Sequence, residues 1–292
     1  MTATGQIFDL GYQPYTGARQ GRGRARWALY TQTLRQAFGL GRGARSKIIP
    51  FTLLGLALIP AAIQLGIVSL LGGDFQPIRY DNYLDLTSIL NILFCATVAP
   101  ELLCPDRRNR TLSLYFAHAI SRLDYAAMKA AALLTALLAI ALGPQVFLFV
   151  GWTLTVKDSW GYVTDNVDVI PRIVAAGLTV SLYLAMLALA VASLTTRRIF
   201  AAGGFIALFL ISSATAGALW ETFETSAARA TMLFSLGELP FDASSWIFGV
   251  AVGPGSLAER TDLPGPLLFL TAVMWAAAGM LVVVRRYVTW EP

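Results

Sequence analysis

The sequence carries little charge: Asp, Glu, Lys and Arg make up 13% of its 292 residues, whereas soluble domains carry about a quarter. It has one histidine, His118, and two cysteines, Cys95 and Cys104. A Ser-His-Asp or Cys-His site therefore lacks its base within the apolar part of the chain. The two cysteines have no metal-ligand spacing and form no disulfide framework.

A phosphate-binding loop is also missing. The glycine-rich run at 39–43 lacks the lysine and the preceding strand of the G-x-x-x-x-G-K-[ST] motif. We therefore expect a chain that is not an enzyme, with no catalytic residue, no metal site and no cofactor of its own.

The residues that are abundant are apolar: 56% of the chain is hydrophobic. Six apolar runs are long enough to cross a bilayer, and a backbone in lipid must satisfy its own hydrogen bonds. The sequence thus predicts an all-α polytopic membrane protein, with a polar segment at 1–47 and a six-span transmembrane domain at 48–292. The predicted spans are 48–71, 86–104, 126–151, 170–194, 199–220 and 263–284.

Basic residues predict the orientation of these spans. If the N-terminus is cytoplasmic, seventeen of the 22 Lys and Arg residues fall on the cytoplasmic side. Such a bias is typical of the cytoplasmic loops of membrane proteins. Both termini are therefore expected in the cytoplasm.

The connection between the second and third spans is unusual because it mixes charge with an apolar pattern. It reads CPDRRNRTLSLYFAHAISRLDYAAMK from Cys104 to Lys129. Leu112, Tyr115 and Phe116 share one helical face, which predicts a short amphipathic helix outside the bilayer. This helix could lie at the lipid surface or dock into a cytosolic protein. A capping box at 121–124, with Asp in place of Glu or Gln, predicts the start of the next helix.

A second amphipathic segment lies between Arg26 and Lys47. Trp27, Tyr30, Leu34 and Phe38 are spaced as one apolar face beside several arginines. This pattern predicts an interfacial helix that lies flat before the first span with its apolar side in the lipid.

Two further expectations concern the ends of the spans. The external connection at 221–262 contains apolar stretches, 230–236 and 245–252, that are too short to cross the bilayer. They are expected to re-enter the outer leaflet or to cap the spans. Glu101, near the inner end of the second span, is expected to pair with Arg107 or Arg108.

Three segments together resemble one known family. GYQPYTGAR at 11–19, the basic interfacial helix and the 104–129 connection are similar to the permease subunits of ABC-2-type ABC transporters. The similarity is to bacterial six-span subunits of the type V exporter kind, whose ATPase is encoded separately. The resemblance implies a bacterial inner-membrane location and an ATPase partner that binds ATP and Mg. It also implies a second permease, either another copy or a homologue, and no nucleic acid.

The resemblance also implies roles for particular residues. The connection at about 105–120 would form the coupling helix that touches the ATPase, and spans two and five would line the dimer axis. The implied ATPase contacts are Asp106, Arg107, Arg108, Arg110, Thr111, Leu112, Tyr115 and Phe116. The implied substrate-path residues are Asn91, Phe94, Phe205 and Phe209.

Two other functions stay open on the sequence. The chain could be a permease-like membrane subunit for interaction or sensing that moves nothing itself. It could also be an ion-coupled secondary carrier. The carrier is disfavoured because the spans hold few charges and show no repeat between the two halves.

Overall fold

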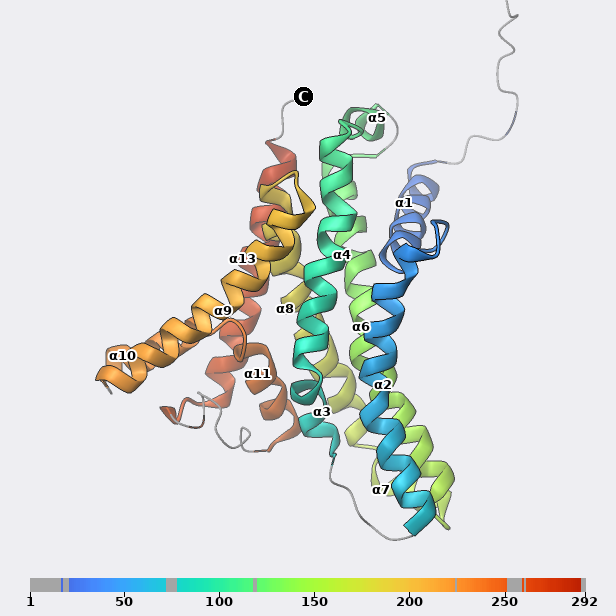
Figure 1. The fold of residues 1–292 in the computed structure, drawn as a ribbon, viewed down its shortest axis with the longest axis vertical. Helices are drawn as coiled ribbons and strands as arrows, with labels where there is room; N and C mark the ends of the chain where they lie inside the picture. Colours follow the sequence, from blue (N-terminus) through green and yellow to red (C-terminus); the bar gives the residue numbers. More distant parts are fainter. Residues whose placement is uncertain are drawn as a thin grey trace, which may run out of the picture.

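The computed structural model describes residues 17, 21–71, 78–117, 120–223, 225–250, 259 and 261–289, with the side chain of Leu71 excepted. Within these residues the secondary structure is helical, and six helices are long and apolar enough to cross a membrane. The protein is thus an all-α polytopic membrane protein, as predicted (Figure 1). The six are α2 (Arg45–Leu71), α4 (Ser88–Arg108), α6 (Arg122–Thr155), α8 (Val169–Leu194), α9 (Arg198–Phe223) and α13 (Gly265–Val288).

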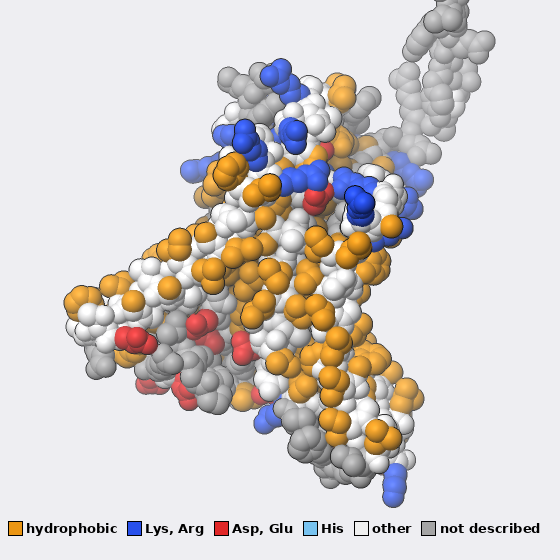
Figure 2. All heavy atoms as spheres, viewed as in Figure 1, with side chains coloured by type: hydrophobic (Ala, Val, Ile, Leu, Met, Phe, Trp, Pro, Cys, Tyr) orange, Lys and Arg blue, Asp and Glu red, His pale blue; other side chains and the backbone are white. Residues whose placement is uncertain are grey.

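Shorter helices lie at the two ends of this bundle. One end carries α1 and α5 together with the C-terminal end of α13; the other carries α3, α7, α10 and α11 (Figure 1). Lys and Arg side chains gather at the first end, which we call the basic end (Figure 2). The shorter elements are α1 (Arg22–Ala37), α3 (Tyr80–Leu86), α5 (Leu112–Phe116), α7 (Ser159–Asp165), α10 (Ser226–Thr231), η1 (Met232–Phe234) and α11 (Leu239–Phe248).

Helix α8 is the centre of the bundle, with contacts to α4, α6, α9, α11 and α13. Its packing against α13 depends on Gly279, where an added Cβ would lie 2.9 Å from the backbone of Met186. A glycine is needed there because the two helix backbones approach closely. By contrast, α9 leans away from the rest of the bundle toward α10 (Figure 1).

The segment after α10 packs back against α8 and α9 within the bundle. The N–H groups of Leu236 and Gly237 donate to Ser212 Oγ (3.3 Å) and Ser213 Oγ (3.2 Å) in the middle of α9. Tyr183 of α8 donates its hydroxyl to the Leu236 carbonyl at 3.1 Å. Ser213 lies about 15 Å along α9 from its C-terminal end. Irregular backbone is stable at such depth because protein side chains satisfy its polar groups.

Candidate functional site at the basic end of the bundle

Helix α4 ends in a Schellman turn that directs the chain into α5. The Thr111 N–H donates to the Asp106 carbonyl at 3.0 Å, and the Arg110 N–H donates to the Arg107 carbonyl at 3.3 Å. The hydroxyl of Thr111 also donates to the Asp106 carbonyl, at 3.2 Å. Arg110 is left-handed, with φ 54°, at the position where this turn usually has glycine. Arg110 therefore adopts a backbone conformation that is unfavourable for a residue with a Cβ atom.

Below this turn lies a buried ion pair. Lys129 of α6 is 2% exposed, and its Nζ lies 2.8 Å from Asp106 Oδ2. The same ammonium donates to the Leu102 carbonyl at 2.9 Å and lies 5.4 Å from the ring centre of Tyr125. The Tyr125 hydroxyl donates to Asp106 at 2.7 Å. These contacts hold the end of α4 to the first turns of α6, because removing either charge would leave the other buried without a partner.

Helix α5 is seated on this cluster through its own apolar side. Leu112 is 1% exposed and belongs to the core. The Tyr115 and Phe116 rings lie 5.5 Å and 6.1 Å from Tyr125, whose ring is 5.1 Å from Tyr287 of α13. Burial, and then the charge of Asp106, raise the pKa of the Tyr115 hydroxyl. The apolar face predicted to fill a partner's groove therefore packs largely on this chain's own spans.

The charged residues of the same segment divide into inward and outward groups. Arg107 donates to the Ser193 and Thr195 carbonyls at the end of α8, so it holds α4 to α8. Arg108 and Arg110 are exposed. Of the predicted ATPase contacts, Asp106, Arg107 and Leu112 are thus engaged inside this chain, and Arg108 and Arg110 point to the surface.

The outward side of α5 also has an exposed apolar side chain, Leu114, at 64%. It was not among the predicted contacts because it lies off the face defined by Leu112, Tyr115 and Phe116. Arg110 and Leu114 form the surface that α5 and the turn before it offer to another molecule, and Arg108 is exposed at the end of α4. His118 and Ala119, which follow, lie outside the described residues, as does the 11–19 segment apart from Gly17.

The capping box at the start of α6 is confirmed and has a second use. The Asp124 N–H donates to Ser121 Oγ at 3.1 Å, and the Ser121 N–H donates to Asp124 Oδ2 at 3.0 Å. The same carboxylate lies 2.7 Å from Arg22 Nε and 2.8 Å from Arg26 Nη2. One aspartate therefore caps α6 and ties α1 to it.

Helix α1, Arg22–Ala37, covers only the first part of the predicted 26–47 segment, and part of its apolar face packs on this chain. The Tyr30 hydroxyl lies 3.0 Å from Thr135 Oγ1 of α6, and Leu34 and Phe38 pack against the protein core. Only Trp27 of the predicted face is well exposed, at 59%. Tyr30, Leu34 and Phe38 are thus half-buried against this chain, a contact that the periodicity alone does not distinguish from lipid.

The predicted partner of Glu101 is also wrong. Its carboxylate pairs with Arg42 at 2.9 Å and with Arg198, and neither Arg107 nor Arg108 pairs with it. Glu101 therefore joins the α1–α2 connection and the start of α9 across α4. The spacing of nearby residues along α4 suggested local partners, but the cations came from distant parts of the chain.

The predicted substrate-path residues lie in the core of the single chain. Asn91, Phe94, Phe205 and Phe209 are each at most 3% exposed, and the last two rings lie 4.6 Å apart. They pack α4 against its neighbours and do not face an open path in this conformation. Hydrophobic side chains are exposed over α4 and α9 (Figure 2). They include Ile89, Leu93, Leu208, Leu210 and Ile211.

The buried cluster contains a residue whose importance the sequence analysis missed. Lys129 was counted as a loop cation, although it falls inside the predicted span 126–151. A lysine within an apolar run is itself a sign of a buried partner. Its partner, Asp106, lies 23 residues earlier and could not be assigned from spacing.

Comparison with known proteins identifies no relative: no family model and no curated protein matches this sequence. Among the described residues, no group of three or more His, Cys, Asp or Glu could hold a metal. The basic end presents the exposed guanidinium groups of Arg108 and Arg110 above the buried Asp106–Lys129 ion pair.

Proposed function

We propose that this chain is the transmembrane permease subunit of an ATP-driven ABC exporter of the ABC-2 type. The observation that carries the proposal is the attachment of α5. Arg110 in the turn before this short helix and Leu114 on the helix are exposed. The helix packs on Tyr125 of α6, which contacts both α4 and α13. A force applied to α5 by a partner would reach three spans at once.

In the proposed complex, two permeases and two ATPase subunits form the working unit in a bacterial inner membrane. ATP and Mg are bound by the ATPase, and the basic end faces the cytoplasm, where the ATPase meets α5. ATP-driven closure of the ATPase pair displaces α5, and the Asp106–Lys129 lock carries this displacement into α4 and α6. Alternating exposure of a path between the two permeases then follows as a shift between conformational states.

The proposal is tested by copurification of the tagged chain from its native host in mild detergent. The wild type should retain a stoichiometric ATPase. Arg110→Gly combined with Leu114→Ser should lower ATPase retention at least tenfold, since a few anchors carry most of the energy of an interface. Glycine suits the left-handed φ of 54°, so this variant removes the charge without straining the turn.

Arg285→Gln with Arg286→Gln, two exposed arginines at the same end of the bundle, is the matched control and should keep the ATPase. Equal loss in the control would mean that α5 is not the docking element. A wild-type preparation that is stable and free of any ATPase would favour a carrier or scaffold. An ATPase that copurifies but is stimulated by no transported compound would favour a sensing subunit.

A further inference from the structure

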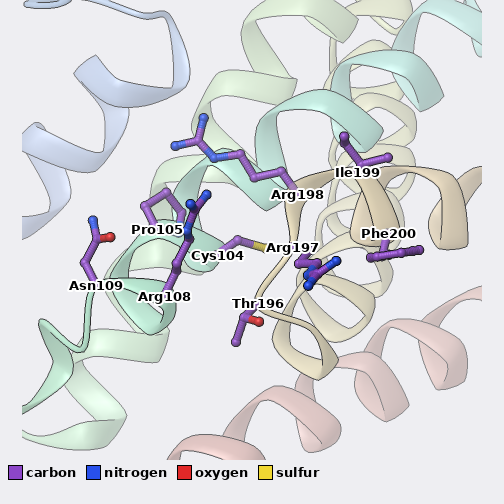
Figure 3. A pocket seen from close by; sticks show the side chains of 9 residues that line it. All are labelled: Cys104, Pro105, Arg108, Asn109, Thr196, Arg197, Arg198, Ile199 and Phe200. Carbon is purple, nitrogen blue, oxygen red and sulfur yellow. The ribbon is translucent and has the colours of Figure 1, made fainter.

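A pocket of about 820 Å³ opens at the basic end between the C-terminal part of α4 and the α8–α9 connection. Figure 3 shows the side chains that line it, with Cys104 between Arg108 of α4 and Arg197 of the connection. The lining residues are Cys104, Pro105, Arg108, Asn109, Thr196, Arg197, Arg198, Ile199 and Phe200. Three of them are arginines and none is acidic, so the pocket favours an anion.

Two of these arginines are available to a ligand. Arg198 pairs with Glu101. Among the residues that the structure describes, neither Arg108 nor Arg197 has an ion pair with an acidic side chain; Arg197 lies 5.8 Å from the ring centre of Phe200. Helix α9 starts at Arg198, beside the pocket, and the positive end of a helix dipole adds to the attraction for an anion. Guanidinium groups are well suited to phosphate because they donate paired hydrogen bonds.

The far side of the pocket is apolar and open. Ile199 is 84% exposed and Phe200 64% exposed, at the first turn of a helix long enough to cross the membrane. A ligand that fits both surfaces has an anionic group for the arginines and a hydrocarbon part for these side chains.

We propose that this pocket binds the phosphate headgroup of an anionic phospholipid, with the acyl chains against Ile199 and Phe200. The exposed apolar residues favour a lipid over a cytosolic protein, because they begin a helix that is long and apolar enough to cross a membrane. Basic pockets between spans on the cytoplasmic side are sites where anionic headgroups bind. The proposal does not depend on ATPase docking, which we assign to Arg110 and Leu114.

The test is native mass spectrometry of the delipidated full chain in detergent, titrated with phosphatidylglycerol or phosphatidylcholine. The wild type should bind phosphatidylglycerol preferentially. Arg108→Gln with Arg197→Gln should weaken its binding about 25-fold, or about fivefold for each guanidinium removed. Ile199→Ser should weaken binding of the long-chain lipid but leave a dihexanoyl analogue unaffected, which separates acyl contacts from headgroup contacts.

Arg285→Gln with Arg286→Gln is the control for general positive charge and should leave phosphatidylglycerol binding unchanged. Size-exclusion profiles confirm that each variant is folded. Equal loss in the control, or equal binding of phosphatidylcholine, would overturn the site. Inorganic phosphate competing at the same concentration as the lipid would show a free-anion site and overturn the lipid assignment. A pocket variant that keeps full lipid binding but loses a copurifying protein would assign the pocket to that protein.

Discussion

The buried side chain of Lys129 makes several of the contacts that hold the basic end together. Its ammonium is 2% exposed and has a carboxylate, a carbonyl and an aromatic ring as neighbours. Removing one partner of such a pair costs more free energy than the intact pair contributes to stability, because the remaining charge is then buried without a partner. This asymmetry gives a direct test of the cluster.

Lys129→Met should destabilise the protein by about 3–5 kcal/mol, because Asp106 is left without its cation. Asp106→Asn combined with Lys129→Met should recover much of this loss, since the asparagine oxygen still accepts from Tyr125 and no charge remains. Thermal unfolding of the detergent-solubilised variants measures the difference. Lys157→Met, at an exposed lysine, is the control. A double variant as unstable as the single one would show that packing, not charge, dominates here.

At the scale of elements, the six spans and the capped start of α6 follow from local patterns, and the structure confirms them. Helix length, apolar content and a capping box are properties of neighbouring residues, so the sequence contains them directly. The residues that cover each helix face come from distant parts of the sequence. Leu112 and Phe94 were expected to face a partner or a path and are buried in the same chain, because an apolar face looks the same whether lipid, a helix or another subunit covers it.

The tether between α1 and α6 can be tested apart from the cap. Asp124→Asn keeps an oxygen that can accept from the Ser121 N–H but removes the charge that holds Arg22 and Arg26. Each of these partly exposed pairs contributes up to about 1 kcal/mol. We expect trypsin to cleave within α1 about three- to tenfold faster in this variant. Asp168→Asn, which breaks an exposed pair with Arg172, is the control and should leave the rate of cleavage in α1 unchanged. If the Asp124→Asn variant is cleaved no faster than this control, α1 is held by its apolar contacts alone.

At the scale of the whole molecule, charge is distributed along the bundle axis. Basic side chains crowd one end, and acidic side chains are visible near α10 and α11 at the other (Figure 2). Both α1 and the end of α13 lie at the basic end (Figure 1), as an even number of spans requires. Basic loops are typically retained in the cytoplasm, so in the proposed orientation α5 and the arginine pocket lie on the side where ATP is found.

Cysteine labelling tests this orientation, because Cys95 and Cys104 are both buried. Ser113 on α5 and Thr164 on α7 are exposed at opposite ends of the bundle. In intact spheroplasts, a membrane-impermeant maleimide should label the Thr164→Cys variant and spare Ser113→Cys, and both should react after lysis. The reverse pattern would place α5 outside the cell, where no ATPase could reach it, and would remove the basis of the proposed exporter. Labelling of neither variant before lysis would show that α7 is covered from outside, and Lys157→Cys, in the same connection, would then decide the orientation.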